Sequence, residues 1–134
     1  MRRFRKLVKT ASRVQFGKID FSQDNLQDKF SEIYPQLEEI LLAVIELRVT
    51  GKKTDRAIGK VLALGELIYE GETDLFPVFI ERFRLSWGII RGYLVFSLHI
   101  VGFVKSLPRV KEERANKAEA VFRRVIEIGD WVAN

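Results

Sequence analysis

Apolar residues recur along most of this chain at spacings of three and four residues, which place them on one face of an α-helix. The pattern predicts four long helices, over residues 35–50, over residues 55–70, from residue 73 or 76 to residue 107, and over residues 110–128, and a short helix around residues 25–33. No segment shows the alternating pattern between tight turns that is typical of strands. The sequence therefore predicts an all-α protein, a helical bundle of about four helices preceded by a basic amphipathic N-terminal arm.

Proline, glycine and threonine residues mark the predicted ends of these helices. Pro35 suits the first turn of a helix, where its missing N–H group costs no intrahelical hydrogen bond. Thr54 is placed to cap the next helix through its hydroxyl group. Gly51, Gly71 and Gly129 are each expected to end a helix, because glycine readily adopts the left-handed conformation that occurs there.

The longest apolar stretch, residues 76–107, contains Gly88 and Gly92, a G-x-x-x-G motif that lets two helices approach closely. We expect this pair at a helix crossing or an assembly interface, with two packed halves or a kink nearby. The part of this stretch from residue 85 to residue 107 has 23 residues, near the ~20 that a bilayer requires, but Arg91 and Lys105 leave only residues 92–104 free of full charges, which is short for a membrane span. A helix that is apolar all round is more typical of a bundle centre or an oligomer interface.

Residues 1–18 form a basic arm that also carries a helical pattern. Five apolar residues fall on one face of a helix predicted over residues 2–15: Phe4, Leu7, Val8, Ala11 and Val14. A helix this short is marginal by itself in water, so we expect it to form against a surface or a partner. We divide the chain into an N-terminal arm, residues 1–22, and a helical bundle, residues 23–134.

Net charge distinguishes this arm from the rest of the chain. The 134 residues include 23 basic and 18 acidic ones, a formal charge of +5. Seven basic residues and no acidic residue lie in the arm: Arg2, Arg3, Arg5, Lys6, Lys9, Arg13 and Lys18. Subtracting these seven leaves 16 basic and 18 acidic residues, so the remainder has a net charge of −2. The asymmetry points to an anionic partner, either nucleic acid or a membrane surface.

The basic start does not predict a signal peptide, since no apolar segment follows it, whereas a mitochondrial presequence remains open. The chain also lacks the residue groupings that enzymes use. It has no cysteine, which excludes a disulfide scaffold, a thiolate zinc site and a cysteine nucleophile. His99 has no acidic residue within a helical turn, and Glu66 and Glu70 lack the histidine of a di-iron site. We expect no catalytic residue, no metal site, no cofactor and no enzymatic activity.

Because Lys and Arg neutralise phosphates without reading bases, the seven arm residues are predicted to bind nucleic acid independently of its sequence. Phe4, Leu7 and Val8 are predicted to pack against the arm of a neighbouring copy, and Trp131 against the bundle or another subunit. The last helix carries further basic residues, either a solvated surface or a second phosphate contact: Arg109, Lys111, Arg114, Lys117, Arg123 and Arg124. A basic amphipathic helix also suits an anionic membrane, so that partner stays open.

The arm MRRFRKLVKTASRVQFGK, followed by a succession of helices from Pro35 to Trp131, resembles the coat proteins of filamentous archaeal viruses. In that family the arm wraps linear double-stranded DNA and the bundle forms the shell of a helical virion. The resemblance implies a nucleocapsid subunit that assembles with itself or a paralogous coat subunit, in a virion formed in the host cytoplasm. The chain is also similar to small helical subunits of RNA-guided type III interference complexes, although those usually spread basic residues over the bundle. A small membrane-associated helical protein is the remaining alternative.

Overall fold

The computed structural model describes residues 2–14, 26–46, 51–108 and 110–134. Within these ranges the chain forms five α-helices and one 3-10 turn, in this order: α1 (Arg2–Ala11), α2 (Leu26–Glu46), α3 (Lys52–Tyr69), η1 (Thr73–Leu75), α4 (Phe76–Val104) and α5 (Glu112–Ala133). The all-α helical bundle predicted from the sequence is confirmed.

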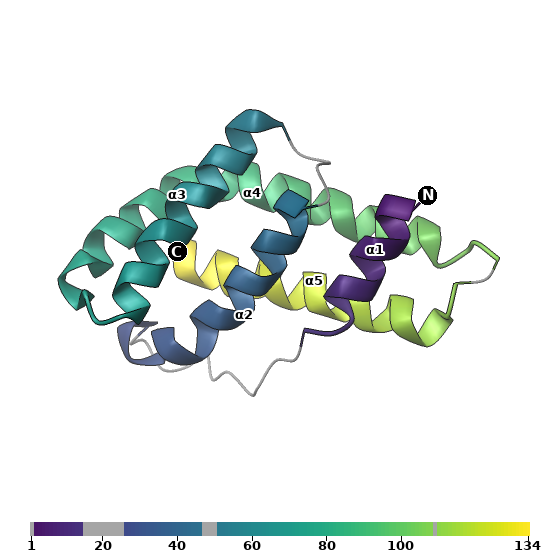
Figure 1. The fold of residues 1–134 in the computed structure, drawn as a ribbon, viewed down its shortest axis with the longest axis horizontal. Helices are drawn as coiled ribbons and strands as arrows, with labels where there is room; N and C mark the ends of the chain where they lie inside the picture. Colours follow the sequence, from purple (N-terminus) through teal and green to yellow (C-terminus); the bar gives the residue numbers. More distant parts are fainter. Residues whose placement is uncertain (1, 15–25, 47–50, 109) are drawn as a thin grey trace.

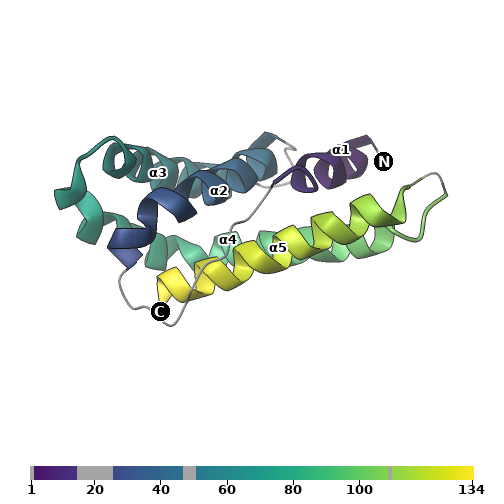
Figure 2. The ribbon, with the colours of Figure 1, turned by 90° about the horizontal axis from the view of Figure 1, so that it is seen from below.

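The helices are arranged in two layers (Figures 1 and 2). α4 and α5 run antiparallel as a long hairpin in one layer, and α2 and α3 lie in the other. α1 covers the end of the hairpin at which α4 ends and α5 begins, and it contacts α5, α4 and α2.

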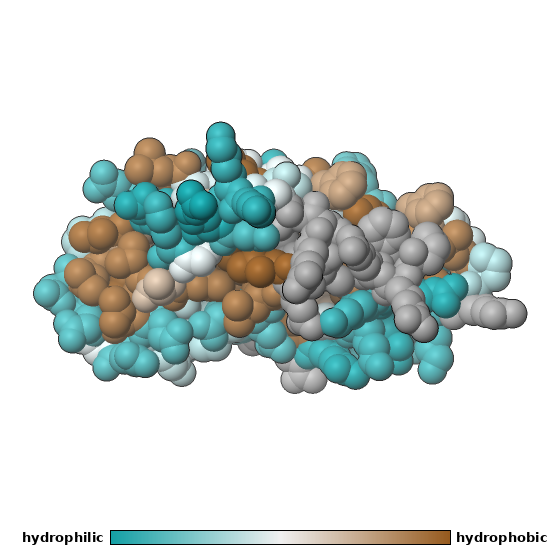
Figure 3. All heavy atoms as spheres, turned by 45° about the horizontal axis from the view of Figure 1, so that its top comes forward, coloured by the Kyte–Doolittle hydropathy of each residue, from teal (hydrophilic) through white to brown (hydrophobic). Residues whose placement is uncertain are grey.

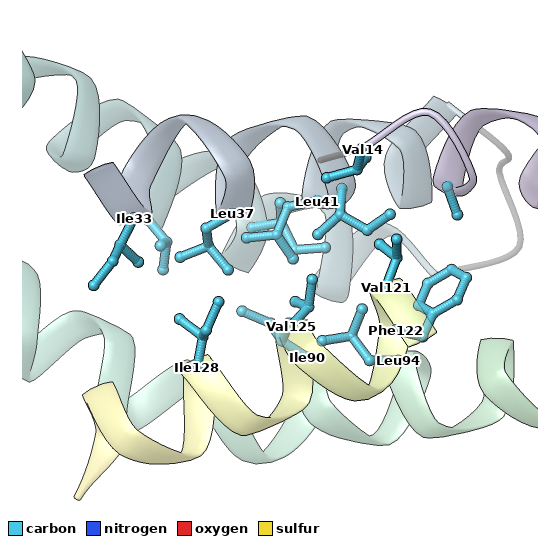
Figure 4. Close-up of a cluster of buried hydrophobic side chains, with 14 of the residues drawn as sticks. Val14, Ile33, Leu37, Leu41, Ile90, Leu94, Val121, Phe122, Val125 and Ile128 are labelled. Atoms are coloured by element: carbon cyan, nitrogen blue, oxygen red, sulfur yellow. The ribbon is translucent and has the colours of Figure 1, made fainter. Parts of the chain in front are cut away.

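One hydrophobic core fills the space between the layers (Figure 4). Leu37 and Leu41 of α2 point toward Leu94 of α4 and Val125 of α5, and all four side chains are buried. Burying each of these side chains contributes about 1.5–3 kcal/mol relative to leaving it exposed. The apolar faces predicted for residues 55–70 and for the last helix lie in this core, with Ile58 among their fully buried members.

α2 begins earlier than the sequence predicts. The short helix expected around residues 25–33 and the helix expected from Pro35 form one continuous helix, with Pro35 in its interior. An interior proline removes one backbone hydrogen bond and crowds the preceding turn. Pro35 is exposed while Ile33, Tyr34 and Leu37 beside it are buried, so the packing of the opposite face holds the helix together.

The end of α3 confirms the prediction for Gly71, which has a φ of 122°. Its N–H donates to the Ile68 carbonyl at 3.0 Å, and the Glu72 N–H donates to the Leu67 carbonyl at 3.0 Å, as in a Schellman motif. The start of α3 differs from the prediction. Gly51 occupies the N-cap of α3, and Thr54 lies buried in the first turn instead of capping the helix. The prediction that Gly51 ends the preceding helix falls beside residues 47–50, which lie outside the described residues.

α4 is one uninterrupted helix of 29 residues, so the expected division into two packed halves is wrong. Gly88 and Gly92 are exposed, and no other part of the described chain lies within 4 Å of a Cβ placed on either. They therefore do not form a helix crossing inside the bundle. The close crossing occurs at Gly129, where a Cβ would overlap the ring of Trp87. α5 accordingly continues through Gly129 to Ala133 instead of ending there.

The described part of the arm, residues 2–14, packs into the same core as the rest of the bundle. Leu7 and Val8 are 1% and 2% exposed, and Ala11 and Val14 are also buried. Leu7 and Val8 are therefore not the contacts to a neighbouring copy that the sequence suggests, because folding of α1 onto α5 covers them within one chain. The predicted boundary at residue 22 lies outside the described residues.

Candidate nucleic-acid interface

The outward side of α1 carries basic residues that were predicted to bind nucleic acid. Four of the predicted residues are exposed: Arg5, Lys6 and Lys9 on α1, and Arg13 just beyond its end. Three others lie where the structure describes no side chain: Arg2, Arg3 and Lys18. The burial of the apolar side of α1 explains this orientation, because the charged side then faces solvent.

A hollow of about 140 Å³ opens where α1 meets the beginning of α5. Three basic and three apolar side chains line it: Arg5, Lys111, Arg114, Val8, Val104 and Val110. Arg5 is thus brought beside basic residues that follow it by about 100 positions in the sequence. The arm and the last helix share one basic concavity.

A second hollow, of about 250 Å³, continues this surface along α5. Ser12, Lys111, Arg114, Lys117 and the acidic Glu113 line it, and Lys111 and Arg114 belong to both hollows. Since Arg5, Lys9 and Ser12 follow one another at helical spacing, Lys9 lies on the same side of α1 between the two hollows. We call Arg5, Lys9, Lys111, Arg114 and Lys117 the α1–α5 basic surface.

Backbone charge adds to the α1–α5 basic surface. α5 begins at Glu112, and the first N–H groups of a helix have no intrahelical acceptor and carry a partial positive charge. The Ser12 hydroxyl donates to the Lys9 carbonyl at 2.9 Å, which is a local bond at the end of α1, and Ser12 lines the second hollow together with Lys111. The surface therefore combines five cationic side chains with the positive end of a helix, whose first turn also carries the carboxylates of Glu112 and Glu113.

The second half of α5 is different, because its basic residues are engaged by acidic neighbours on the same helix. Arg123 donates to Glu119 at 3.2 Å, and Arg124 donates to Glu127 at 3.2 Å. Exposed pairs of this kind contribute about 0.3–0.5 kcal/mol each. The basic line predicted along the last helix thus divides into a phosphate-accessible beginning and an internally paired end, while Arg109 lies outside the described residues.

The residues predicted for assembly fall in three places. Gly88 and Gly92 lie on the outward side of α4, and Trp131 is half-buried against the core. Leu7 and Val8 lie inside the core, as described above, and the side chain of Phe4 is outside the described part. Of the predicted assembly residues that the structure describes, only the two glycines are exposed.

Two polar groups inside the fold serve packing, and sequence patterns did not reveal either. Tyr34 donates to the Leu62 carbonyl at 2.7 Å and lies against Gly65, where a Cβ would overlap its ring. Burial, reinforced by the nearby Glu38 carboxylate, raises the pKa of Tyr34 well above its usual range, so the phenol stays protonated. Trp87 Nε1 donates to Asp130 Oδ1 at 2.7 Å, which fixes the indole against Gly129.

Other candidate chemistry is dispersed. His99 lies exposed on α4, and among the described residues no group of three or more His, Asp or Glu side chains is arranged to hold a metal ion. Residues 73–104 are long and apolar enough to cross a membrane by length and composition, and one third of the most apolar window is buried in the bundle. A comparison with protein-family models, curated proteins and solved structures finds no match.

Proposed function

We propose that this chain is a non-enzymatic structural subunit that coats nucleic acid and binds its phosphates through the α1–α5 basic surface. The observation that carries the proposal is that Arg5 lines the same hollow as Lys111 and Arg114. Two basic segments from opposite ends of the chain converge on one surface, and cationic side chains arranged in this way neutralise successive phosphates. Such contacts fix the protein on the duplex without reading its sequence.

The burial of the apolar face of α1 favours nucleic acid over an anionic membrane as the partner of this surface. An amphipathic helix binds a membrane by inserting its apolar face among the lipids. Leu7, Val8 and Ala11 lie in the core, so the side chains of α1 that the structure describes as exposed are charged ones: Arg5, Lys6 and Lys9. Phosphate binding needs only those charges.

The resemblance to coat proteins of filamentous archaeal viruses gives the proposal its finer form. Under it, the nucleic acid is linear double-stranded DNA and the protein is a virion coat subunit, alone or with a paralogous partner. In this protein the described arm is folded against the bundle, so the DNA would lie along a basic face shared by α1 and α5. An RNA duplex presents the same phosphate chemistry and is the direct competitor.

The experiment measures binding to a mixed-sequence DNA duplex over a salt series. A fourfold variant with Arg5, Lys111, Arg114 and Lys117 changed to Gln is compared with the unmodified chain. A matched control carries the same charge change on the exposed start of α3, at Lys52, Lys53, Arg56 and Lys60. Deleting residues 1–18 is less informative, because it would also remove Leu7 and Val8 from the core.

We expect the slope of log K against log salt to become shallower by about 3.6 in the fourfold variant, since each phosphate contact contributes about −0.9. The control should keep its slope within about 1 of the unmodified chain. If the slope becomes equally shallow in both variants, binding depends on the total charge of the protein, and the α1–α5 basic surface is not the binding site. If the unmodified chain binds an RNA duplex more tightly than the DNA duplex, RNA becomes the proposed partner in place of DNA.

A further inference from the structure

The outward side of α4 carries a stripe of exposed residues whose spacing alternates between four and three along its whole length. The stripe comprises eight residues: Val78, Arg82, Leu85, Ile89, Gly92, Phe96, His99 and Phe103. Its members are all exposed, with Leu85 reaching 73% and Phe103 59%. This alternation is the 3.5-residue repeat by which one helix packs along another. We call these residues the α4 stripe.

The α4 stripe has no partner within the described chain. The opposite side of α4 packs against α5 and α3, which accounts for its buried residues. The five large apolar side chains of the stripe together expose on the order of 500 Å², and patches of this size commonly mark interaction sites. Figure 3 shows that hydrophobic atoms lie exposed between hydrophilic ones on one face of the molecule.

We infer that two copies of this chain pair through the α4 stripe in antiparallel orientation, about a two-fold axis that passes between residues 90 and 91. A two-fold interface brings the same patch of both copies together, so each position must suit its symmetry mate. About this axis the stripe maps onto itself: Val78 meets Phe103, Arg82 meets His99, Leu85 meets Phe96 and Ile89 meets Gly92. Every large apolar side chain of the stripe thus meets an apolar residue or a glycine.

Charge and side-chain size favour the antiparallel over the parallel arrangement. Parallel pairing would place Arg82 against Arg82, and like charges opposite one another are destabilising. It would also place Gly92 against Gly92, leaving a gap between the helices. The antiparallel arrangement places Ile89 above the open backbone at Gly92, around which nothing lies within 4 Å. Small residues at this point allow the helix axes to approach closely.

A hollow of about 120 Å³ on the α4 stripe has the form of a hole that receives a side chain from a second helix. It is lined by Val78, Glu81, Arg82 and Leu85, which stand at positions i, i+3, i+4 and i+7. Four residues at these positions form the holes of coiled-coil packing. In the antiparallel arrangement His99 of the second copy, the symmetry mate of Arg82, lies over this hollow.

The extent of the stripe suits a stable dimer. From Val78 to Phe103 the helix axis is about 38 Å long. Burial of its apolar side chains and their flanks approaches the ~800 Å² per partner of a standard interface. Lipid is a poorer occupant, because α4 is held to α5 by buried apolar packing, with Leu94 and Val125 among the buried residues. Insertion of α4 would draw the charged surface of α5 toward the bilayer.

The pairing adds to the proposed function the surface through which copies meet, and it stands on α4 alone. Its test is the mass of the full-length protein in the absence of nucleic acid, measured by sedimentation velocity over a wide concentration range. The outcome is therefore independent of DNA binding. We expect a dimer whose dissociation constant rises on the order of 100-fold or more in Leu85→Glu, because the substitution occurs twice in a symmetric interface. Leu42→Glu, at a half-exposed leucine on α2, is the matched control and should leave the dimer intact.

The orientation of the two helices is tested by cross-linking at introduced cysteines. These react specifically, because the unmodified chain has no cysteine. Chains carrying Leu85→Cys and Phe96→Cys are treated with a short bismaleimide, each alone and as a mixture. Antiparallel pairing predicts cross-linking only in the mixture, because identical positions then lie about 16 Å apart along the axis. Cross-linking of either chain with itself would overturn the orientation. A protein that stays monomeric at every concentration would overturn the pairing. If that monomer also floats with anionic vesicles, and Leu85→Glu abolishes the flotation, the α4 stripe binds lipid instead of a second copy.

Discussion

Replacing Leu7 by alanine distinguishes an arm that belongs to the core from one that lies free in solution. Leu7 is 1% exposed within the cluster that joins α1 to α2, α4 and α5. The substitution removes three buried carbon atoms from α1 without changing its charge or its helix propensity appreciably. Any loss of stability therefore reports on the packing of this side chain.

The expected loss of stability in Leu7→Ala follows from the burial of the leucine side chain. At ~0.8 kcal/mol per buried carbon, the lost transfer free energy is about 2.4 kcal/mol. The cavity left behind adds to this loss, so that buried Leu→Ala substitutions typically lower the free energy of unfolding by about 2–5 kcal/mol. We expect about 3 kcal/mol, because α1 is short and near the chain end, where the surroundings can partly close the cavity. In a chain of this size that loss lowers Tm by about 10 °C.

The assay is urea unfolding followed by far-ultraviolet circular dichroism, with unchanged m-values as the condition for comparing free energies. Leu42→Ala, which truncates a leucine that is 49% exposed on α2, is the matched control and should cost about 1 kcal/mol or less. If Leu7→Ala stays within about 0.5 kcal/mol of the unmodified protein, α1 is not held in the core. The buried face of α1 would then be free for a membrane or a neighbouring copy.

Three further sites give predictions: two glycines whose replacement should change stability in opposite directions, and a buried tyrosine whose effect depends on pH. Gly129→Ala should lower the free energy of unfolding by about 2 kcal/mol, because the new methyl group overlaps the Trp87 ring. Gly59→Ala, at an open position in α3, should raise the free energy of unfolding by about 0.5–1 kcal/mol. Both are measured by urea unfolding, and equal effects would contradict the close crossing of α4 and α5 at Gly129. Tyr34→Phe should cost about 1 kcal/mol at neutral pH through the lost hydrogen bond to the Leu62 carbonyl. Burial raises the pKa of Tyr34 in the folded state, so its stabilising contribution is complete below about pH 10 and is lost as pH rises above that value. Unfolding midpoints measured across alkaline pH should fall less steeply in Tyr34→Phe, and parallel curves would refute the burial of this phenol.

The sequence by itself determined the helices and the sign of the charge on each part of the chain. Helical periodicity is a local property, so the buried face of α3, with Ile58 and Val61, and that of α5, with Val121 and Phe122, were predictable from spacing alone. Gly71 was predictable for the same reason, since a left-handed residue after a helix is a local requirement. Pro35 was not, because whether a helix continues across a proline depends on what packs against its other side.

The tertiary structure alone decided which apolar faces are covered and which charges meet. α4 is apolar on several sides, so no pattern within it could show that Gly88 and Gly92 face outward while Trp87 meets Gly129. The same holds for α1, whose amphipathic pattern is identical whether its apolar face meets the core or another copy. The nearness of Arg5 and Arg114 is likewise a matter of packing, because the two lie on helices at opposite ends of the chain. Local spacing fixes a helix and its faces, but the partner of each face is chosen by long-range burial of apolar surface, which acts across the whole chain.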